Sequence, residues 1–269
     1  MDRHKQLYLL SLVLTVSLLI FVSAWMLDWG NSPTVGNRSS KASADSGIDG
    51  EFVTGGGITV TRSVELIEAE NRELLEVYKN MKEDNPDFAG FIRITGTAVE
   101  YPVMYTPYEP EKYIHMDINC ADSEDGLPFI DARCSIDPDS DNIIIYGHNM
   151  KDGSMFASLI SYQNKAYYDE HPVIRYDTAD EIREYEIMSV FYDRVYYTDE
   201  TDVFKFYNFI DASDEADFDR NVSQYLKKSV YDTGVTAHYG DKLITLVTCA
   251  YHTENGRFVV IAKRKQNTE

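Results

Sequence analysis

The chain has 269 residues, of which 43% are hydrophobic and 13% aromatic, and its formal net charge is −20. This length allows one large domain or two small ones, and the composition supports a globular core. The negative charge argues against nucleic acid or an anionic membrane surface as a partner, and otherwise indicates a solvated acidic surface.

The N-terminal segment is basic and then strongly apolar. Residues 1–6 include Arg3 and Lys5, and residues 7–27 (LYLLSLVLTVSLLIFVSAWML) carry no charged side chain. About 20 apolar residues span a bilayer as a helix, and a basic flank stays on the cytoplasmic side. The pattern predicts a transmembrane signal anchor with the rest of the chain extracellular. The alternative is a cleaved signal peptide, because residues 22–24 (VSA) resemble a cleavage site.

The next two segments differ sharply in composition. Residues 28–60 are rich in small polar residues and glycine, which predicts a flexible extracellular stalk before a catalytic domain over 61–269. Apolar residues at helical spacing then predict an amphipathic helix packed on the domain, ended by Asn85-Pro86. These residues are Val64, Ile67, Leu74, Leu75, Tyr78 and Met81.

From residue 88 the pattern changes to short apolar runs separated by turn residues. The runs cover 91–94, 99–104, 127–130, 142–146, 173–176, 183–192, 242–248 and 257–263. Many short strands of this kind predict a mostly β fold with a closed or nearly closed barrel. A helix over 214–228 interrupts the series before the last two strands, with acidic residues in its first turn and lysines in its last.

Three cysteines, Cys120, Cys134 and Cys249, do not make a disulfide framework. Cys120 and Cys134 remain open as one pair outside the cell. Cys249 lies at the end of an apolar strand, and Asn255-Gly256 predicts a hairpin turn that brings Arg257 to the neighbouring strand. A guanidinium there can stabilise a thiolate or an oxyanion, although an inert thiol beside a surface arginine has the same local sequence.

Two histidines are candidate partners for this thiol. His252 is nearer in sequence but falls in the hairpin loop, which fixes its geometry poorly, and no second Cys or His pair completes a metal site. His148 follows the apolar run 142–146 and Gly147, so a strand delivers it to one end of the barrel. We expect His148 to be the partner, against the alternative of a packing residue.

These residues resemble the sortases, and in particular class B sortases of the clostridial type. TLVTC (245–249) matches the TLxTC signature, Arg257 the arginine of the following strand, and YGHNMKDGSMF (146–156) the histidine segment. NPDFAGFI (85–92) and YPVM (101–104) fit the early strands of that class, and the resemblance covers about 64–264. It implies a sortase-type barrel with an N-terminal helix and a helix before the cysteine strand.

The resemblance also implies the chemistry. A membrane-anchored cysteine transpeptidase would cleave the C-terminal sorting signal of secreted proteins after Thr. It would transfer the acyl group to a peptidoglycan amine and so anchor surface proteins to the cell wall. Cys249, His148 and Arg257 would be catalytic, with the Ala250 backbone N–H as an oxyanion helper, and neither cofactor nor metal is implied. Ile114 and the segment after Val203 would line the peptide groove.

Three alternatives stay open on sequence grounds. One is a sortase that polymerises pilins through a lysine acceptor, another an inactive membrane-anchored binding module, and the third a plain cysteine protease, which the arginine disfavours. The chain departs from the class at Val247, where members often have Ser, and at Cys120 and Cys134, which the pattern does not include.

Overall fold

The computed structural model describes residues 56–266, with side chains from residue 66 onward. The predicted basic flank (1–6), membrane anchor (7–27) and most of the predicted stalk lie outside the described residues. Within the described part, no helix combines the length and apolar character needed to cross a membrane.

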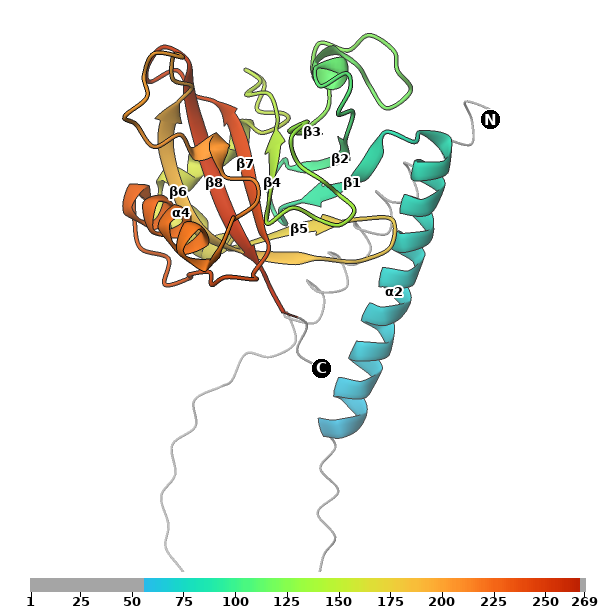
Figure 1. The fold of residues 1–269 in the computed structure, drawn as a ribbon. Coiled ribbons are helices and arrows are strands. Elements are labelled where there is room, and N and C mark those ends of the chain that lie inside the picture. Colours follow the sequence, from blue (N-terminus) through green and yellow to red (C-terminus); the bar gives the residue numbers. More distant parts are fainter. Residues whose placement is uncertain (1–55, 267–269) are drawn as a thin grey trace, which may run out of the picture. The chain divides into compact units, whose positions relative to one another are not determined.

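Eight strands of the described chain form one closed barrel in the order β1-β2-β3-β4-β7-β8-β6-β5 (Figure 1). The strands are β1 (Phe88–Arg93), β2 (Glu100–Met104), β3 (Phe129–Ile130), β4 (Asn142–Tyr146), β5 (Val173–Asp177), β6 (Glu184–Arg194), β7 (Leu243–Cys249) and β8 (Gly256–Arg264). The β2–β3 and β4–β7 pairs are parallel and the other pairs antiparallel. Closure leaves no exposed sheet edge, and it confirms the predicted barrel and all eight of its strands.

The strands that end at the candidate site are the most deeply buried. In β4 and β7 every residue but the last is buried, as the unbroken apolar runs of the sequence require. Packing on both faces fixes these strands, and therefore also the residues that follow their ends.

The first helix, α2 (Gly56–Asp84), packs on the barrel through its C-terminal half only. Tyr78 is buried, stacks on Phe91 at 5.5 Å and donates a hydrogen bond to Asp177 at 3.2 Å. Leu66 and Ile67 are 61% and 56% exposed in the half that extends beyond the barrel (Figure 1). The predicted helix and its end at Asn85-Pro86 are confirmed. The prediction that Ile67 packs on the domain is wrong, because this part of the helix extends past the barrel.

The late helix, α4 (Glu215–Lys228), forms as predicted before β7. Asp214 caps it by accepting a hydrogen bond from the Asp217 amide at 2.8 Å, a contact that stabilises a helix by about 1 kcal/mol. Its apolar face buries Phe218, Val222 and Tyr225. Shorter helical segments were not predicted, because a few residues show no helical period: α3 (Lys165–Glu170), η1 (Lys112–His115), η2 (Ala157–Gln163) and η3 (Phe206–Asn208).

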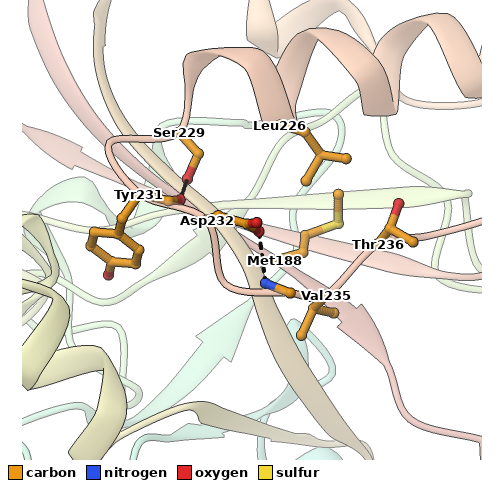
Figure 2. A pocket seen from close by; sticks show the side chains of 8 residues that line it. Met188, Leu226, Ser229, Tyr231, Asp232, Val235 and Thr236 are labelled. Carbon is orange, nitrogen blue, oxygen red and sulfur yellow. Dashed lines mark hydrogen bonds between the residues drawn. The ribbon is translucent and has the colours of Figure 1, made fainter.

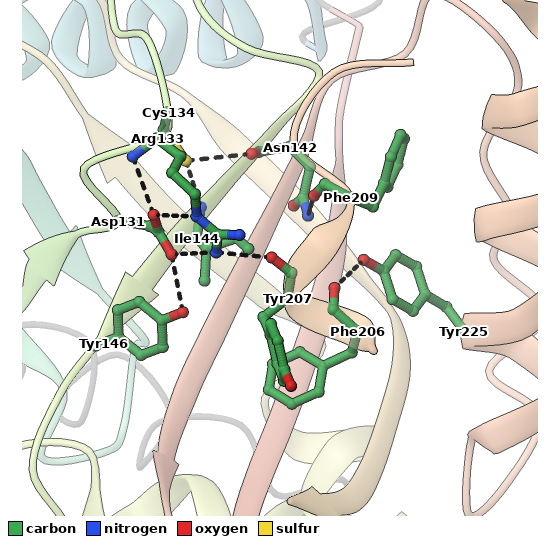
Figure 3. A network of polar contacts seen from close by, with 10 residues as sticks. All are labelled: Asp131, Arg133, Cys134, Asn142, Ile144, Tyr146, Phe206, Tyr207, Phe209 and Tyr225. Carbon is green, nitrogen blue, oxygen red and sulfur yellow. Dashed lines mark hydrogen bonds and ion pairs between the residues drawn. The ribbon is translucent and has the colours of Figure 1, made fainter. Parts of the chain in front are cut away.

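A polar network ties β4 to the segment around η3 (Figure 3). Asp131 accepts hydrogen bonds from Arg133 and from the Tyr146 hydroxyl, and Arg133 also donates to the Tyr207 carbonyl. Buried Cys134 lies in the same network, where its thiol donates to the Asn142 carbonyl at 3.6 Å. All three cysteines are free, so Cys120 and Cys134 form no disulfide.

Candidate active site

The end of β4 and the end of β7 lie side by side because the two strands pair in parallel, with Tyr146 opposite Val247. Hydrogen bonds continue this pairing beyond the strands. The Thr248 hydroxyl donates to the Gly147 carbonyl at 2.9 Å, and the Asn149 amide group donates to the Cys249 carbonyl at 2.7 Å. His148, which lies between Gly147 and Asn149, is thereby held beside the strand end that carries Cys249.

Cys249 and Arg257 are directly opposite each other in the β7–β8 pair, as the hairpin predicts. The next pair toward the loop is hydrogen-bonded, since the Ala250 N–H donates to the Gly256 carbonyl at 3.0 Å. Pairs alternate along an antiparallel ladder, so 249/257 is a pair without hydrogen bonds, in which Cα atoms approach to about 4.5 Å. Both side chains therefore leave the same face of the sheet at close spacing.

Within the described residues, the hydrogen bonds of the Arg257 guanidinium go to backbone carbonyls. Its Nη1 donates to the carbonyls of Gly256 at 2.9 Å and Asn255 at 3.3 Å. No carboxylate of the described residues forms an ion pair with it. Half-buried Cys249 is thus paired across the hairpin with an arginine whose guanidinium has further N–H donors to offer.

Two residues of η1 are neighbours of His148. Its Nε2 lies 3.0 Å from the Ile114 carbonyl, and its ring stacks on His115 with centroids 5.8 Å apart and planes at 15°. A carbonyl only accepts hydrogen bonds, so this contact places a proton on Nε2. Nδ1 is then the ring nitrogen available for proton transfer. Residues of η1, more than thirty positions upstream, therefore orient the histidine.

Gly147 is required by a close approach. A Cβ at this position would lie 2.6 Å from the Phe156 ring, and the Phe156 amide in turn donates to the His148 carbonyl at 2.8 Å. The glycine allows the 146–156 segment to fold back on itself directly next to His148.

The other two residues of the predicted site also lie at this end of the barrel. The Ala250 N–H donates to the Gly256 carbonyl at 3.0 Å, and its role as an oxyanion helper stays a prediction. Half-buried Ile114 does lie at the site, where its carbonyl meets His148. Whether the Ile114 side chain lines a peptide groove stays a prediction.

His252 lies in the hairpin loop, as expected. It is exposed, and its ring packs edge-on against Tyr192 with centroids 4.7 Å apart. Asn255 adopts a left-handed φ of 54° at the end of this loop, which is the turn chemistry that the Asn-Gly pair predicts. The structure joins His252 to the loop and β6, with no bond to Cys249 or Arg257.

A pocket of about 510 Å³ lies elsewhere, between the end of α4 and the loop after it (Figure 2). It is lined by Met188, Leu226, Ser229, Tyr231, Asp232, Gly234, Val235 and Thr236. None of the three predicted catalytic residues lines it. Among the residues that the structure describes, no group of three His, Cys, Asp or Glu side chains is arranged to hold a metal ion.

Comparison with known proteins points in one direction. The model of the sortase domain matches residues 92–265. The chain is 31% identical to sortase B of Listeria monocytogenes over 195 residues, which is 72% of this chain and 76% of the relative. A mutant form of Clostridium perfringens sortase B is 27% identical with a TM-score of 0.65, covering 74% of this chain and 91% of that one. A Staphylococcus aureus sortase B–substrate complex has the same TM-score at 23% identity, covering 78% and 94%.

Proposed function

The chain belongs to the sortase family, as a class B cysteine transpeptidase, and we propose that it cleaves the sorting signal of secreted proteins after Thr and joins them to a peptidoglycan amine. The observation that carries this proposal is the direct opposition of Cys249 and Arg257 at the strand end next to His148. A nucleophile, a cation and a proton carrier on three neighbouring strand ends are the groups that acyl transfer requires.

In the first half-reaction the Cys249 thiolate attacks the carbonyl carbon of the Thr residue. The Arg257 guanidinium stabilises the oxyanion with N–H donors that its two backbone contacts leave available. His148, as imidazolium, gives its Nδ1 proton to the leaving amine while Nε2–H stays on the Ile114 carbonyl. The C–N bond breaks, and a thioester to Cys249 remains.

In the second half-reaction an amine of a peptidoglycan precursor attacks the thioester. Neutral His148 takes the proton from the attacking nitrogen at Nδ1, and the thiolate of Cys249 leaves. The enzyme returns to its starting protonation state, and the surface protein is joined to the cell wall by an amide bond.

The setting of the enzyme is part of the proposal. The uncharged segment 7–27 would anchor the chain in the cell membrane with residues 61–269 facing the wall. Ile114 and the segment after Val203 would contact the extended peptide. Sequence composition supports the anchor, and the place of η1 beside His148 supports the groove.

The direct test is mass spectrometry of the thioacyl adduct. The purified extracellular part is incubated with a library of sorting-motif peptides, and we expect a mass increase on the peptide that contains Cys249. Adding precursor amines or purified pilin then identifies the acceptor: a glycine- or diaminopimelate-type product supports wall anchoring, whereas a lysine-linked pilin overturns it. Absence of an adduct with every peptide contradicts the transpeptidase mechanism.

A further inference from the structure

Arg257 has a carboxylate residue as its neighbour on the strand at its other side. Asp193 of β6 is directly opposite Arg257 in the β6–β8 pair. The Val195 N–H donates to the Asn255 carbonyl at 3.0 Å, so alternation makes 193/257 a hydrogen-bonded pair with Cα atoms about 5.5 Å apart. Cys249, Arg257 and Asp193 thus form one row across three strands, with their side chains on the same face.

Asp193 is a buried carboxylate with one counter-charge. Its side chain is 3% exposed, and Oδ1 accepts hydrogen bonds from the Tyr196 hydroxyl at 2.7 Å and the Arg194 amide at 2.9 Å. Oδ2 accepts no hydrogen bond of good geometry from the described residues, and its partner is the Lys228 ammonium at 3.0 Å. Lys228 ends α4, and its amine also lies 5.9 Å from the centre of the Phe191 ring.

Removing Lys228 would leave this carboxylate without compensation. A buried charge without a partner is strongly destabilising, so the Asp193 carboxylate would bind another cation that is close enough to reach it. Arg194 is adjacent in sequence but lies on the opposite face of β6 and is bound to Glu200. Arg257 lies on the same face of the sheet as Asp193 and has no carboxylate partner within the described chain.

An ion pair between Arg257 and Asp193 would turn the Arg257 guanidinium away from Cys249. Asp193 and Cys249 are on the two strands that flank β8, so a guanidinium bound to the carboxylate points away from the thiol. The bidentate geometry of an arginine–carboxylate pair would hold it there. In the structure the Arg257 guanidinium instead donates to the Gly256 and Asn255 carbonyls and does not bind Asp193.

We propose that Lys228 is a positioning residue for the transpeptidase: it occupies Asp193 and so keeps Arg257 free to act beside Cys249. The inference rests on the role of Arg257 in the proposed function. It assigns to α4 a part in the reaction that neither the pocket beside it nor the strand motif indicates.

A set of charge variants tests the proposal through kcat/KM for transpeptidation of a sorting-motif peptide. Lys228→Met keeps most of the length of the side chain and removes its charge, and we expect kcat/KM to fall by at least about tenfold. Lys228→Arg keeps the charge and should retain the rate. The double variant Lys228→Met/Asp193→Asn should return to within about threefold of wild type, because no carboxylate is left to capture Arg257.

The matched control is Lys227→Met, which removes the same charge from the exposed neighbouring position of α4. The melting temperature of each variant shows whether a lower rate comes from a loss of folded protein.

A fall in kcat/KM in Lys228→Met that the double variant does not recover indicates a structural role and overturns the proposal. Full activity in Lys228→Met overturns it as well. Arg257→Ala separates the two levels: if it is inactive while Lys228→Met is fully active, only the positioning role is lost. If Arg257→Ala is fully active, the proposed role of Arg257 fails and the positioning role with it.

Discussion

Cys134 and Cys249 lie in two contrasting regions of one barrel. Cys134 is buried in the wall beside β4, within hydrogen-bond distance of the Ile144 amide and the Asn142 carbonyl. Burial raises the pKa of its thiol to about 12, so the neutral form is held there. Cys249 ends its strand, is half-buried and is paired with Arg257 across the β7–β8 hairpin. The proposed function needs the Cys249 thiol to be reactive, whereas burial in the segment between β3 and β4 keeps the Cys134 thiol in its neutral, unreactive form.

The sharpest test of this contrast replaces each cysteine in turn. Cys249→Ala removes the nucleophile, and we expect kcat/KM for transpeptidation to fall by about 10⁴-fold or more. Cys134→Ala should retain the rate and lower the free energy of unfolding by about 1 kcal/mol, through the lost packing and contacts. Chromatographic detection of the ligated peptide measures the rate. Near-wild-type activity in Cys249→Ala would contradict the active-site assignment.

The two histidines extend the comparison from the thiol to its partner. His148→Ala removes the proposed acid and base, and we expect a loss of about 10²- to 10⁴-fold in kcat/KM. His252→Ala removes an exposed ring that contacts Tyr192, and most of the rate should remain. The same ligation assay compares them. If the His252 variant lost as much as the His148 variant, the choice of His148 would be wrong.

The sequence predicted the strands and the pairing at the site because both depend on local patterns. Unbroken apolar runs mark β4 and β7, and the Asn255-Gly256 turn places Arg257 opposite Cys249. The surroundings of these residues depend on chain packing and carry no such pattern. The Ile114 carbonyl, the His115 ring and the Asp193–Lys228 pair all approach from segments far away in sequence. The hydrogen bond of the Ala250 amide to the Gly256 carbonyl was likewise not predicted, since it depends on how the hairpin loop closes.

Gly147 tests whether the scaffold at the end of β4 positions His148. Gly147→Ala places a methyl group 2.6 Å from the Phe156 ring, and overpacking of this kind costs about 1–3 kcal/mol of unfolding free energy. Urea denaturation followed by circular dichroism measures this cost. We expect kcat/KM to fall beyond what the loss of folded protein explains, because the strain is relieved by moving the 146–156 segment. The double variant Gly147→Ala/Phe156→Leu should recover part of the rate, and no recovery would show that the ring is not the obstacle.

The free energy of unfolding at alkaline pH tests the other cysteine of the comparison, Cys134. Because folding raises the pKa of Cys134 to about 12, the native thiol keeps its proton at pH values where the unfolded thiol, with a pKa of about 8.5, has lost it. Native protein then binds more protons than unfolded protein, so stability falls as pH rises from about 8.5, and this contribution is fully lost near 12. Between pH 8.5 and about 9.5 unfolded tyrosines, with a pKa of about 10, are still largely protonated. In that window Cys134→Ala should flatten the decline by about 1 kcal/mol, measured by urea unfolding at closely spaced pH values. Parallel curves for the variant and the wild type would mean that Cys134 ionises in the folded barrel, and the proposed difference between the wall and the strand end would then not exist.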